Sequence, residues 1–334
     1  MSERYILVMK EVPNEDFSVL EPEFKVICMD TMSDEEKANL YSDILPNTEG
    51  IIATDGVTSE LIAKALKLKV IVVNGAGYDD IDVSAASALH VPVYNIPDLT
   101  ANATAELALS LMLDVSRRVS ELNFKLRNDP LNAKDYFKIG RYAGHSLSGK
   151  TLGIIGMGNI GTRLAKMARG LNMNIIYTQR HQLPIGLEQG IRYYYFHELL
   201  AASDIVSIHC PLTDETRGMF NEKAFMRMKA GSILINTARG EIVDQQLLIR
   251  FLHSGKLLGA GLDVFPNGND VEMELLKLPN VVCTPHIGAN TVQTRNEMAA
   301  RIVSIVKAVC NDEPVLKGNL INGESLRAKS SIIL

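Results

Sequence analysis

The chain of 334 residues has few cysteines, and they lie far apart, at Cys28, Cys210, Cys283 and Cys310. No C-x-x-C pair and no zinc-ligand spacing occurs, so the sequence predicts reduced thiols and no metal site. No apolar run approaches the ~18 residues of a membrane span, and the first residues, Met1–Arg4, lead directly into an apolar strand pattern. We therefore expect a soluble, cytoplasmic protein that makes no use of a membrane.

The sequence also lacks a strong excess of charge of either sign. It has 34 basic and 39 acidic side chains, which gives a net charge of −5 and argues against nucleic acid or an anionic membrane as the main partner. Hydrophobic residues make up 46% and charged residues 22%, which excludes disordered, collagen-like and coiled-coil chains. At ~100–200 residues per domain, the length predicts two domains.

Short apolar runs of the strand type alternate with amphipathic helical patterns along the chain. In the first third, the predicted strands are Tyr5–Met9, Val26–Met29, Gly50–Ala53, Val70–Val73 and Val91–Asn95. The helices predicted between them include Ser33–Tyr41, Ser59–Leu66 and Val83–Leu89. This order predicts an α/β domain, a parallel sheet with helices on both faces.

A second set of strands follows a long apolar helix, Thr104–Val115, and a polar arm with scattered aromatics, Arg117–Gly144. The strands of this set are predicted at Thr151–Ile155, Asn174–Thr178, Ile205–His209, Ser232–Asn236, Leu258–Asp263 and Val281–Thr284. Six strands with a glycine-rich first turn predict a doubly wound dinucleotide-binding domain. The helix Thr294–Val309 is expected to return to the first domain, and the tail from Gly323 carries no recognisable pattern.

The glycine-rich turn is the segment Gly156–Gly161, which reads G-x-G-x-x-G and contains Asn159 and Ile160. It follows a predicted strand and opens a predicted helix, which is the context that a pyrophosphate site requires. Gly156 allows the tight turn, Gly158 allows the backbone to approach the phosphates, and Gly161 allows helix and strand to pack closely. The pattern therefore predicts a bound dinucleotide.

The residues after the second strand of this domain indicate which dinucleotide is bound. An NAD site places Asp or Glu about 20 residues after the glycines, but this sequence has Gln179 followed by Arg180. A carboxylate would repel the 2′-phosphate of NADP, whereas a guanidinium can pair with it through two hydrogen bonds. The pair predicts a preference for NADP(H), with NAD(H) use possible. The alternative is that Arg180 is only a solvated loop cation.

Two candidate catalytic residues follow later strands of the same domain. Arg239 comes after the fourth strand and His286 after the sixth, and the carboxyl ends of strands line the ligand crevice of a doubly wound sheet. An arginine can hold a carboxylate and polarise a carbonyl, while a protonated histidine can donate a proton as hydride arrives. This pair suits the reduction of a 2-oxo acid. A structural ion pair and a turn histidine are the alternatives.

These residues belong to a set of motifs in which the chain resembles the D-isomer-specific 2-hydroxyacid dehydrogenase family. The resemblance extends from about Ile51 to about Pro314. Its pattern is closest to that of the NADP-dependent glyoxylate/hydroxypyruvate reductases. The motifs are Gly75–Asp79, Thr104–Glu106, Gly149–Gly156, His209–Thr213, the Arg239 motif, Gly261–Phe265 and the His286 motif.

The resemblance implies a role for each matching residue. Arg239 would bind the substrate, His286 would exchange the proton, and the backbone amides of Ala76 and Gly77 would hold the substrate carboxylate. Asp263 would hold the nicotinamide carboxamide. The remaining implied cofactor contacts are Thr104, Pro211, Thr216, Thr237, Ala238 and Gly288.

The resemblance also implies the domain organisation and the partners. Residues 1–102 and 292–321 would form a discontinuous, flavodoxin-like substrate domain, and residues 103–291 a Rossmann-type dinucleotide-binding domain, followed by a tail of residues 322–334. Closure of the two domains would exclude water. An arm at about residues 117–144 would build a homodimer. The small-molecule partner would be a 2-oxo or 2-hydroxy acid.

One position departs from the family pattern. The family pairs its histidine with a glutamate five residues after the Asp263 position, and this sequence has Gly268 there. A loop bending at Gly268 could bring Asp270 to His286; the alternative is that the histidine has no carboxylate partner. Without one, the histidine would titrate near its ordinary pKa of ~6.5, and reduction would weaken as the pH rises through that value.

The sequence thus predicts NADPH-dependent reduction of a small 2-oxo acid, such as glyoxylate or hydroxypyruvate, to the D-2-hydroxy acid. Two alternatives stay open. One is a non-catalytic dinucleotide sensor, similar to the corepressors that share this fold, and the absent glutamate gives it weight. The other is an enzyme whose altered loop at Gly268 admits a bulkier 2-oxo acid or a substrate that is not a hydroxy acid.

Overall fold

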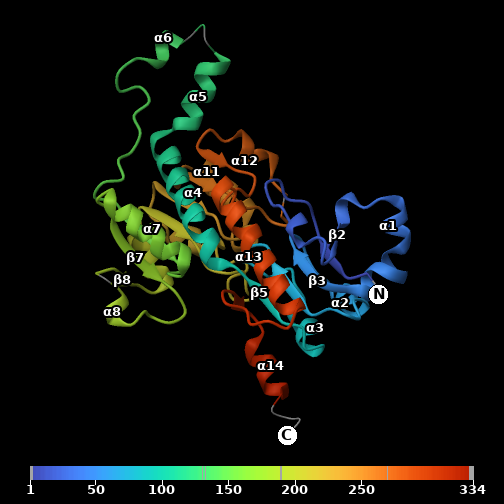
Figure 1. Cartoon of the computed structure of the whole chain (residues 1–334). Coiled ribbons are helices and arrows are strands. Elements are labelled where there is room, and N and C mark those ends of the chain that lie inside the picture. The colour runs from blue at the N-terminus through green and yellow to red at the C-terminus, as the bar shows by residue number, and fades with distance from the viewer. Residues whose placement is uncertain (1–2, 130, 132, 189, 269, 331–334) are drawn as a thin grey trace. The chain divides into compact units, whose positions relative to one another are not determined.

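The computed structural model describes residues 3–129, 131, 133–188, 190–268 and 270–330. The chain divides into two compact units, which are described separately here. Unit 1 comprises Met1–Thr100 and Ala289–Leu334, and unit 2 comprises Ala101–Gly288. Figure 1 shows the course of the chain through both units. The sequence analysis predicted domain boundaries between residues 102 and 103 and between residues 291 and 292. What each unit binds stays a prediction.

Unit 1 contains, within its described residues, a sheet of six strands in the order β13-β5-β4-β3-β1-β2. The strands are β1 (Tyr5–Val8), β2 (Lys25–Cys28), β3 (Thr48–Ala53), β4 (Val70–Val73), β5 (Val93–Asn95) and β13 (Asn319–Leu320). β1 to β5 pair in parallel in the flavodoxin-like order, and β13 adds an antiparallel edge. The carboxyl ends of β1, β3, β4 and β5 therefore share one edge of the sheet.

The helices of unit 1 begin at recognisable capping residues. The α-helices are α1 (Asp34–Asn39), α2 (Ser59–Lys64), α3 (Val83–Ala88), α13 (Val292–Cys310) and α14 (Gly323–Ser330). Ser33, Thr58, Asp82 and Thr291 each accept a backbone N–H at a helix start, and Ser33 forms a capping box with Glu36. Shorter helical turns are η1 (Ser18–Leu20), η2 (Met29–Thr31), η4 (Leu45–Asn47) and the π-helical turn η3 (Leu40–Ile44).

The core of unit 1 lies on both faces of its sheet. Alternate residues of β1 and β4 point to opposite faces, so Leu7 and Ile71 pack on one face and Ile6 and Val72 on the other. The second face is covered by α13, whose buried residues include Met298, Ile302, Ile305 and Val306. The predicted return of this helix to the first domain is therefore correct.

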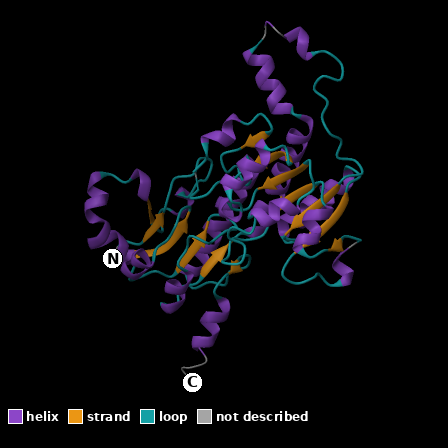
Figure 2. Ribbon diagram, turned by 180° about the vertical axis from the view of Figure 1, so that it is seen from behind, coloured by secondary structure: helices purple, strands orange, loops and turns teal. Residues whose placement is uncertain are grey.

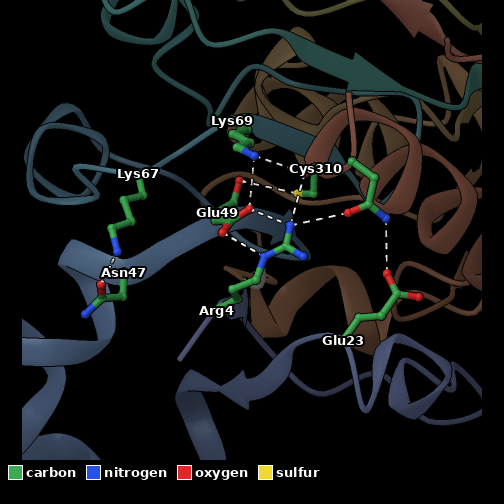
Figure 3. Close-up of polar contacts among 8 residues, drawn as sticks. Arg4, Glu23, Asn47, Glu49, Lys67, Lys69 and Cys310 are labelled. Carbon is green, nitrogen blue, oxygen red and sulfur yellow. Dashed lines mark hydrogen bonds and ion pairs between the residues drawn. The ribbon is translucent and has the colours of Figure 1, made fainter. Parts of the chain in front are cut away.

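A partly buried ion cluster joins the end of α13 to the edge of the sheet at which the parallel strands begin (Figure 3). Arg4 donates two hydrogen bonds of 2.8 and 2.9 Å to the Glu49 carboxylate, and Lys69 lies 3.4 Å from the same group. Both cations also donate to the carbonyl of Cys310 at 3.0 Å, where the α13 dipole favours positive charge. The hydrogen bond from Arg4 lowers the pKa of Glu49.

Unit 2 contains, within its described residues, a parallel sheet of seven strands in the order β12-β11-β10-β9-β6-β7-β8. The strands are β6 (Thr151–Ile155), β7 (Asn174–Thr178), β8 (Arg192–Tyr193), β9 (Ile205–Ile208), β10 (Ser232–Asn236), β11 (Leu257–Leu262) and β12 (Val281–Cys283). This is the Rossmann order, in which the order of successive strands reverses between β6 and β9 while all strands stay parallel. The prediction of six strands missed β8, which has only two residues.

The helices of unit 2 cover both faces of the sheet (Figure 2). They are α7 (Asn159–Gly170), α8 (Ile185–Glu188), α9 (Phe196–Ala202), α10 (Glu222–Arg227), the 3₁₀ turn η6 (Gly240–Ile242), α11 (Gln245–His253) and α12 (Met273–Lys277). α4 (Pro97–Arg117) begins in unit 1 and continues into unit 2, starting earlier than predicted because Pro97 suits a first helical position. No helix within the described residues is long and apolar enough to span a bilayer.

The predicted arm contains α5 (Val119–Asn128) and α6 (Ala133–Tyr136), which project from the body of unit 2 in both views (Figures 1 and 2). Several of its apolar side chains are exposed: Val119 by 56%, Phe124 by 67%, Phe137 by 75% and Ile139 fully. The sheet below it is packed on both faces, with Leu234 on one face and Ile233 and Ile235 on the other. Among the described residues of unit 2, the exposed large apolar side chains are most concentrated in the arm.

Candidate active site

The glycine-rich turn of unit 2 leads from β6 into α7. Gly156 has a φ of +97°, and a Cβ there would lie 2.6 Å from the carbonyl oxygen of His209. A Cβ on Gly161 would lie 2.1 Å from the carbonyl oxygen of Gly156. Both positions therefore need glycine for the protein's own packing. A Cβ on Gly158, in contrast, would meet no described atom within 4 Å.

The start of α7 offers backbone donors at this open position. Its N-cap is Gly158, which has no side chain to accept the N–H groups of the first turn at Asn159 and Ile160. Free N–H groups and the positive end of the helix dipole attract phosphate. The residues present thus fit a dinucleotide pyrophosphate.

Gln179 follows β7, and its side chain forms hydrogen bonds within the loop that is predicted to contact the cofactor ribose. Its Oε1 accepts from the Met157 N–H at 3.2 Å, and its Nε2 donates to the carbonyl of His181 at 2.7 Å. The side chain therefore ties the glycine-rich turn to the loop that carries Arg180. Arg180 is exposed, and its charge helps to lower the pKa of Glu215, after the larger effect of the hydrogen bond from Thr213.

The turn after β9 contains two more predicted cofactor contacts. Thr216 donates its hydroxyl to the carbonyl of Pro211 at 2.7 Å and accepts the Thr213 N–H at 2.8 Å. The Thr216 side chain thus closes the turn that presents Pro211. Because β7 and β9 both pair in parallel with β6, this turn and the Gln179 loop lie at the same edge of the sheet.

A buried asparagine that sequence reasoning missed shapes the turn of Arg239. Asn236, only 1% exposed, accepts the Ala238 N–H at 3.0 Å and donates to the carbonyl of Arg239 at 2.8 Å. The Arg239 guanidinium donates to the Ala238 carbonyl at 2.8 Å. Gly240 packs so tightly on the next loop that a Cβ would lie 2.0 Å from the carbonyl carbon of Phe265.

The side chain of His209, which directly follows β9, contacts Thr237 in the same turn. Its Nε2 is 2.8 Å from the Ser207 hydroxyl and its Nδ1 is 3.4 Å from the Thr237 hydroxyl. Burial lowers the pKa of His209 to about 3, so the ring is neutral at pH 7. The imidazole therefore supports Thr237 without adding charge at the end of β10.

Asp263 organises the turn that carries His286. The Asp263 carboxylate, on a residue only 1% exposed, accepts from the Thr284 hydroxyl at 2.6 Å and from the N–H groups of Ile287 and Gly288 at 2.8 Å. The Asp263 carbonyl also accepts the His286 N–H at 3.0 Å. Asp263 was expected to hold the nicotinamide carboxamide. Within the described residues, the hydrogen bonds of its carboxylate all go to this turn, and the carboxamide contact stays a prediction.

The turn holds His286 in a left-handed conformation, with a φ of +55° and an exposed side chain. Such a conformation costs roughly 1–2 kcal/mol for a residue other than glycine, and the Asp263 hydrogen bonds offset it. A Cβ on Gly288 would lie 3.1 Å from the Asp263 carboxylate and 3.3 Å from the Thr104 side chain. Thr104, Asp263 and Gly288, all predicted cofactor contacts, therefore lie together.

Two carboxylates accept hydrogen bonds from the loop in which the family glutamate is missing. Asp270 accepts from the Asn267 side-chain amide at 3.1 Å, and Glu241 accepts from the Asn267 N–H at 3.0 Å. Gly268 has a φ of +80°, as the expected bend requires. The pairing of Asp270 with His286 stays a prediction. Glu241, which follows the Arg239 turn, is a second candidate that the sequence did not suggest.

In unit 1, the predicted carboxylate-binding segment follows β4. The carbonyl of Gly75 accepts the Ile96 N–H at 3.0 Å, and the carbonyl of Ala76 accepts from the Asn95 side chain at 2.6 Å. In a trans peptide the next N–H points away from the carbonyl, so the N–H groups of Ala76 and Gly77 face away from β5. Within the described residues, neither N–H donates to a protein acceptor.

A buried charge pair supports the start of this segment. Asn74 donates to the Glu15 carboxylate at 2.5 Å, and Arg295 at the start of α13 donates to the other oxygen at 3.0 Å. The Glu15 side chain is fully buried, and burial raises its pKa against the opposing effects of Arg295 and Asn74. These two hydrogen bonds hold the start of the segment that carries the backbone N–H groups of Ala76 and Gly77.

Residues 109–288 match the family described as D-isomer specific 2-hydroxyacid dehydrogenase, NAD binding domain. A glyoxylate reductase of Thermococcus litoralis is 41% identical over 280 residues, which cover 82% of this chain and 83% of the relative.

Two solved structures are also similar. The NADPH-dependent glyoxylate/hydroxypyruvate reductase of Sinorhizobium meliloti, in complex with NADP and malonate, has a TM-score of 0.82 at 27% identity, covering 95% of this chain and 97% of that chain. An acyclic imino acid reductase (Bsp5) in complex with NADPH and D-Arg has a TM-score of 0.79 at 25% identity. That similarity covers 95% of this chain and all of the other.

Proposed function

Because the chain belongs to the D-isomer specific 2-hydroxyacid dehydrogenase family, we propose that it reduces a small 2-oxo acid with NADPH to the D-2-hydroxy acid. Glyoxylate and hydroxypyruvate are the proposed substrates. One observation carries the proposal. The turns that contain Arg239 and His286 lie at the same edge of the sheet as the Gly156–Gly161 turn, because β6, β10 and β12 run parallel.

When bound, the reduced dinucleotide supplies a hydride. In unit 2, the Gly158 turn and the first N–H groups of α7 bind the pyrophosphate, and Arg180 binds the 2′-phosphate. Arg239 binds the carboxylate and polarises the 2-oxo group of the substrate, and His286 donates a proton to the oxygen. In unit 1, the N–H groups of Ala76 and Gly77 bind the substrate carboxylate.

A steady-state panel tests the reaction. Glyoxylate, hydroxypyruvate, pyruvate, phenylpyruvate and 2-ketogluconate are each assayed with NADPH and with NADH. We expect the highest kcat/KM for glyoxylate or hydroxypyruvate with NADPH, and a fall of about 10²–10⁴-fold in kcat for His286→Gln. Tight NADPH binding without turnover of any acid would instead favour the dinucleotide sensor.

The cofactor preference rests on Gln179 and Arg180. The double variant with Gln179→Asp and Arg180→Ser should shift the ratio of kcat/KM values from NADPH toward NADH, because it replaces a phosphate-binding cation by a ribose-binding acid. Arg227→Ser, which removes an exposed cation from α10, is the control. An unchanged ratio would show that this loop does not select the cofactor.

We also propose that the arm at residues 117–144 joins two copies of the chain. Its exposed Phe124, Phe137 and Ile139 are the supporting observation, since an uncovered apolar surface of this kind marks an interface. Light scattering should give twice the 36.7 kDa chain mass, and Phe137→Asp with Ile139→Asp should give the monomer. A wild-type protein that runs as a monomer at all concentrations would contradict the proposal.

Reduction of an imino acid is a second candidate. Gly268 stands where the family has a glutamate, and an imino acid reductase is among the similar structures. A protonated imine already carries its proton and depends less on a histidine whose pKa a carboxylate raises. Adding methylamine to the panel tests this candidate: a higher kcat/KM with pyruvate plus methylamine than with pyruvate alone would favour imine reduction.

A further inference from the structure

The carboxylate-binding segment of unit 1 is shaped by a residue from the far end of the chain. We propose that Asn95 and Asn319 are positioning residues that hold the N–H groups of Ala76 and Gly77 toward the substrate. Together they form a hydrogen-bonded relay from the carboxy-terminal strand β13 to Ala76. This inference rests on the proposed function, in which those N–H groups bind the carboxylate of a 2-oxo acid.

The relay consists of two short hydrogen bonds in series. The Asn319 amide nitrogen donates to Oδ1 of Asn95 at 2.7 Å, and Nδ2 of Asn95 donates to the carbonyl of Ala76 at 2.6 Å. The carbonyl of Ala76 can only accept, so Nδ2 of Asn95 must face it and Oδ1 must face Asn319. Asn95 is 3% exposed, so its bond to the Ala76 carbonyl is shielded from water, while the donor Asn319 is exposed.

The relay determines where the Gly77 N–H points. A planar trans peptide places the N–H of Gly77 opposite the carbonyl of Ala76. While Asn95 holds the Ala76 carbonyl toward β5, the Gly77 N–H points away from β5. The Ile96 N–H does the same for the preceding peptide through the Gly75 carbonyl. Without the Asn95 bond, the peptide between Ala76 and Gly77 is free to rotate, because Gly77 has no Cβ to restrict it.

The carboxy-terminal segment is anchored firmly enough to act as the fixed end of this relay. β13 pairs antiparallel with β5, with Asn319 opposite Asn95. Beyond β13, the Ile321 N–H donates to the Val93 carbonyl at 2.8 Å. Asn322, 4% exposed, accepts the Val93 N–H at 3.0 Å and donates to the Val91 carbonyl at 2.9 Å. These bonds fix the register that brings Asn319 to Asn95.

Two variants break the relay at different points. Asn95→Asp places a carboxylate oxygen against the Ala76 carbonyl and a negative charge near the substrate anion. Asn319→Ala removes the outer donor on an exposed residue, without adding charge or opening the core. The control is Asn311→Ala, which removes an exposed asparagine of unit 1 that contacts Arg4 and Glu23.

The measurement is steady-state kinetics with glyoxylate and NADPH, together with inhibition by oxalate. We expect the KM for glyoxylate and the oxalate Ki to rise at least about 10-fold in Asn95→Asp and about 2–5-fold in Asn319→Ala, with the KM for NADPH unchanged. The control should match the wild type. An unchanged glyoxylate KM in Asn319→Ala, or an equal rise in both KM values, would overturn the proposal.

Hydrogen–deuterium exchange separates this proposal from the proposed function. The backbone N–H groups of Asn74, Gly75 and Ile96, which are hydrogen-bonded around the segment, should exchange faster in Asn95→Asp and Asn319→Ala than in the wild type and in Asn311→Ala. If the wild type reduces no 2-oxo acid, the proposed function fails, and faster exchange still shows that the relay holds the segment. Equal exchange in all four proteins would contradict the relay, whatever their activity.

Discussion

The two units shape their candidate anion sites in different ways. In unit 2, the Gly156–Gly161 turn is defined by glycines within one short segment, two of which the protein's own backbone requires. In unit 1, the Ala76–Gly77 segment is held by Asn95, which is in turn held by Asn319, 224 residues away. A local motif thus forms one site, and distant segments brought together by the sheet form the other.

This difference means that the two sites fail differently under mutation. A substitution inside the glycine turn acts on the turn directly. A substitution in the unit 1 relay acts on the site through one or two hydrogen bonds, each worth about 0.5–1.5 kcal/mol. The following predictions test that difference, beginning with the largest expected effect.

Gly161→Ala should have the largest effect, because its Cβ would collide with the Gly156 carbonyl. We expect a loss of about 1–3 kcal/mol of stability and little NADPH binding. Gly158→Ala is the matched variant, since its Cβ meets no described atom. It should keep the wild-type Tm while the KM for NADPH rises. Thermal melts with titrations of NADPH measure both, and equal Tm losses would contradict the distinction.

Asp263→Asn should affect catalysis more than binding. The asparagine amide is a donor that faces the donors of Thr284, Ile287 and Gly288, so the His286 turn should shift. A shift of about 1 Å at a catalytic group costs roughly 100-fold in rate. We therefore expect kcat to fall by about that factor. Wild-type kcat in the variant would show that the turn does not depend on this carboxylate.

Unit 2 should lose stability first in mild acid because of His209. Burial lowers the pKa of His209 to about 3, whereas the unfolded chain titrates near 6.5. Between these values the unfolded state binds more protons, so stability falls as the pH drops from 6.5 toward 3, by about 2 kcal/mol at pH 5. Denaturant unfolding at several pH values should show this slope, and His209→Gln should remove it.

Unit 1 should show a smaller effect at lower pH. The hydrogen bond from Arg4 lowers the pKa of Glu49 below its ordinary 4.5, so its stabilising contribution is complete above that value and is lost as the pH falls below it. Glu49→Gln should abolish this acid dependence and lower the stability at neutral pH. If unit 1 responded to acid before unit 2, the assignment of these two groups would be wrong.

The sequence predicted the features that depend on local patterns. The strand β6 and the start of α7 were expected because a short apolar run and the glycine spacing are visible within ten residues. β8, β13 and α14 were not, since strands of two residues have no period and the tail has no apolar stripe. Arg239 and His286 were expected from motifs at strand ends, which topology brings to one edge.

The supporting residues could not be predicted in this way. Glu241 and Asn319 act through contacts with segments far away in the chain, whereas Asn236 acts on the turn two and three residues after it. A single asparagine or glutamate at the end of a short element has no distinctive neighbours in sequence. Asp263 was expected from the family to hold the cofactor, but the turn that it builds became visible only in three dimensions. Distant hydrogen bonds, unlike periodicity, leave no trace in one sequence.

Hydride transfer from NADPH to a 2-oxo acid is the central claim, and isotope transfer tests it most directly. NADPH carrying deuterium in both C4 positions of the nicotinamide is mixed with glyoxylate and the enzyme, and the product is examined by proton NMR. The account predicts glycolate with one deuterium on C2. Glycolate without deuterium, or no product from any acid of the panel, would contradict it.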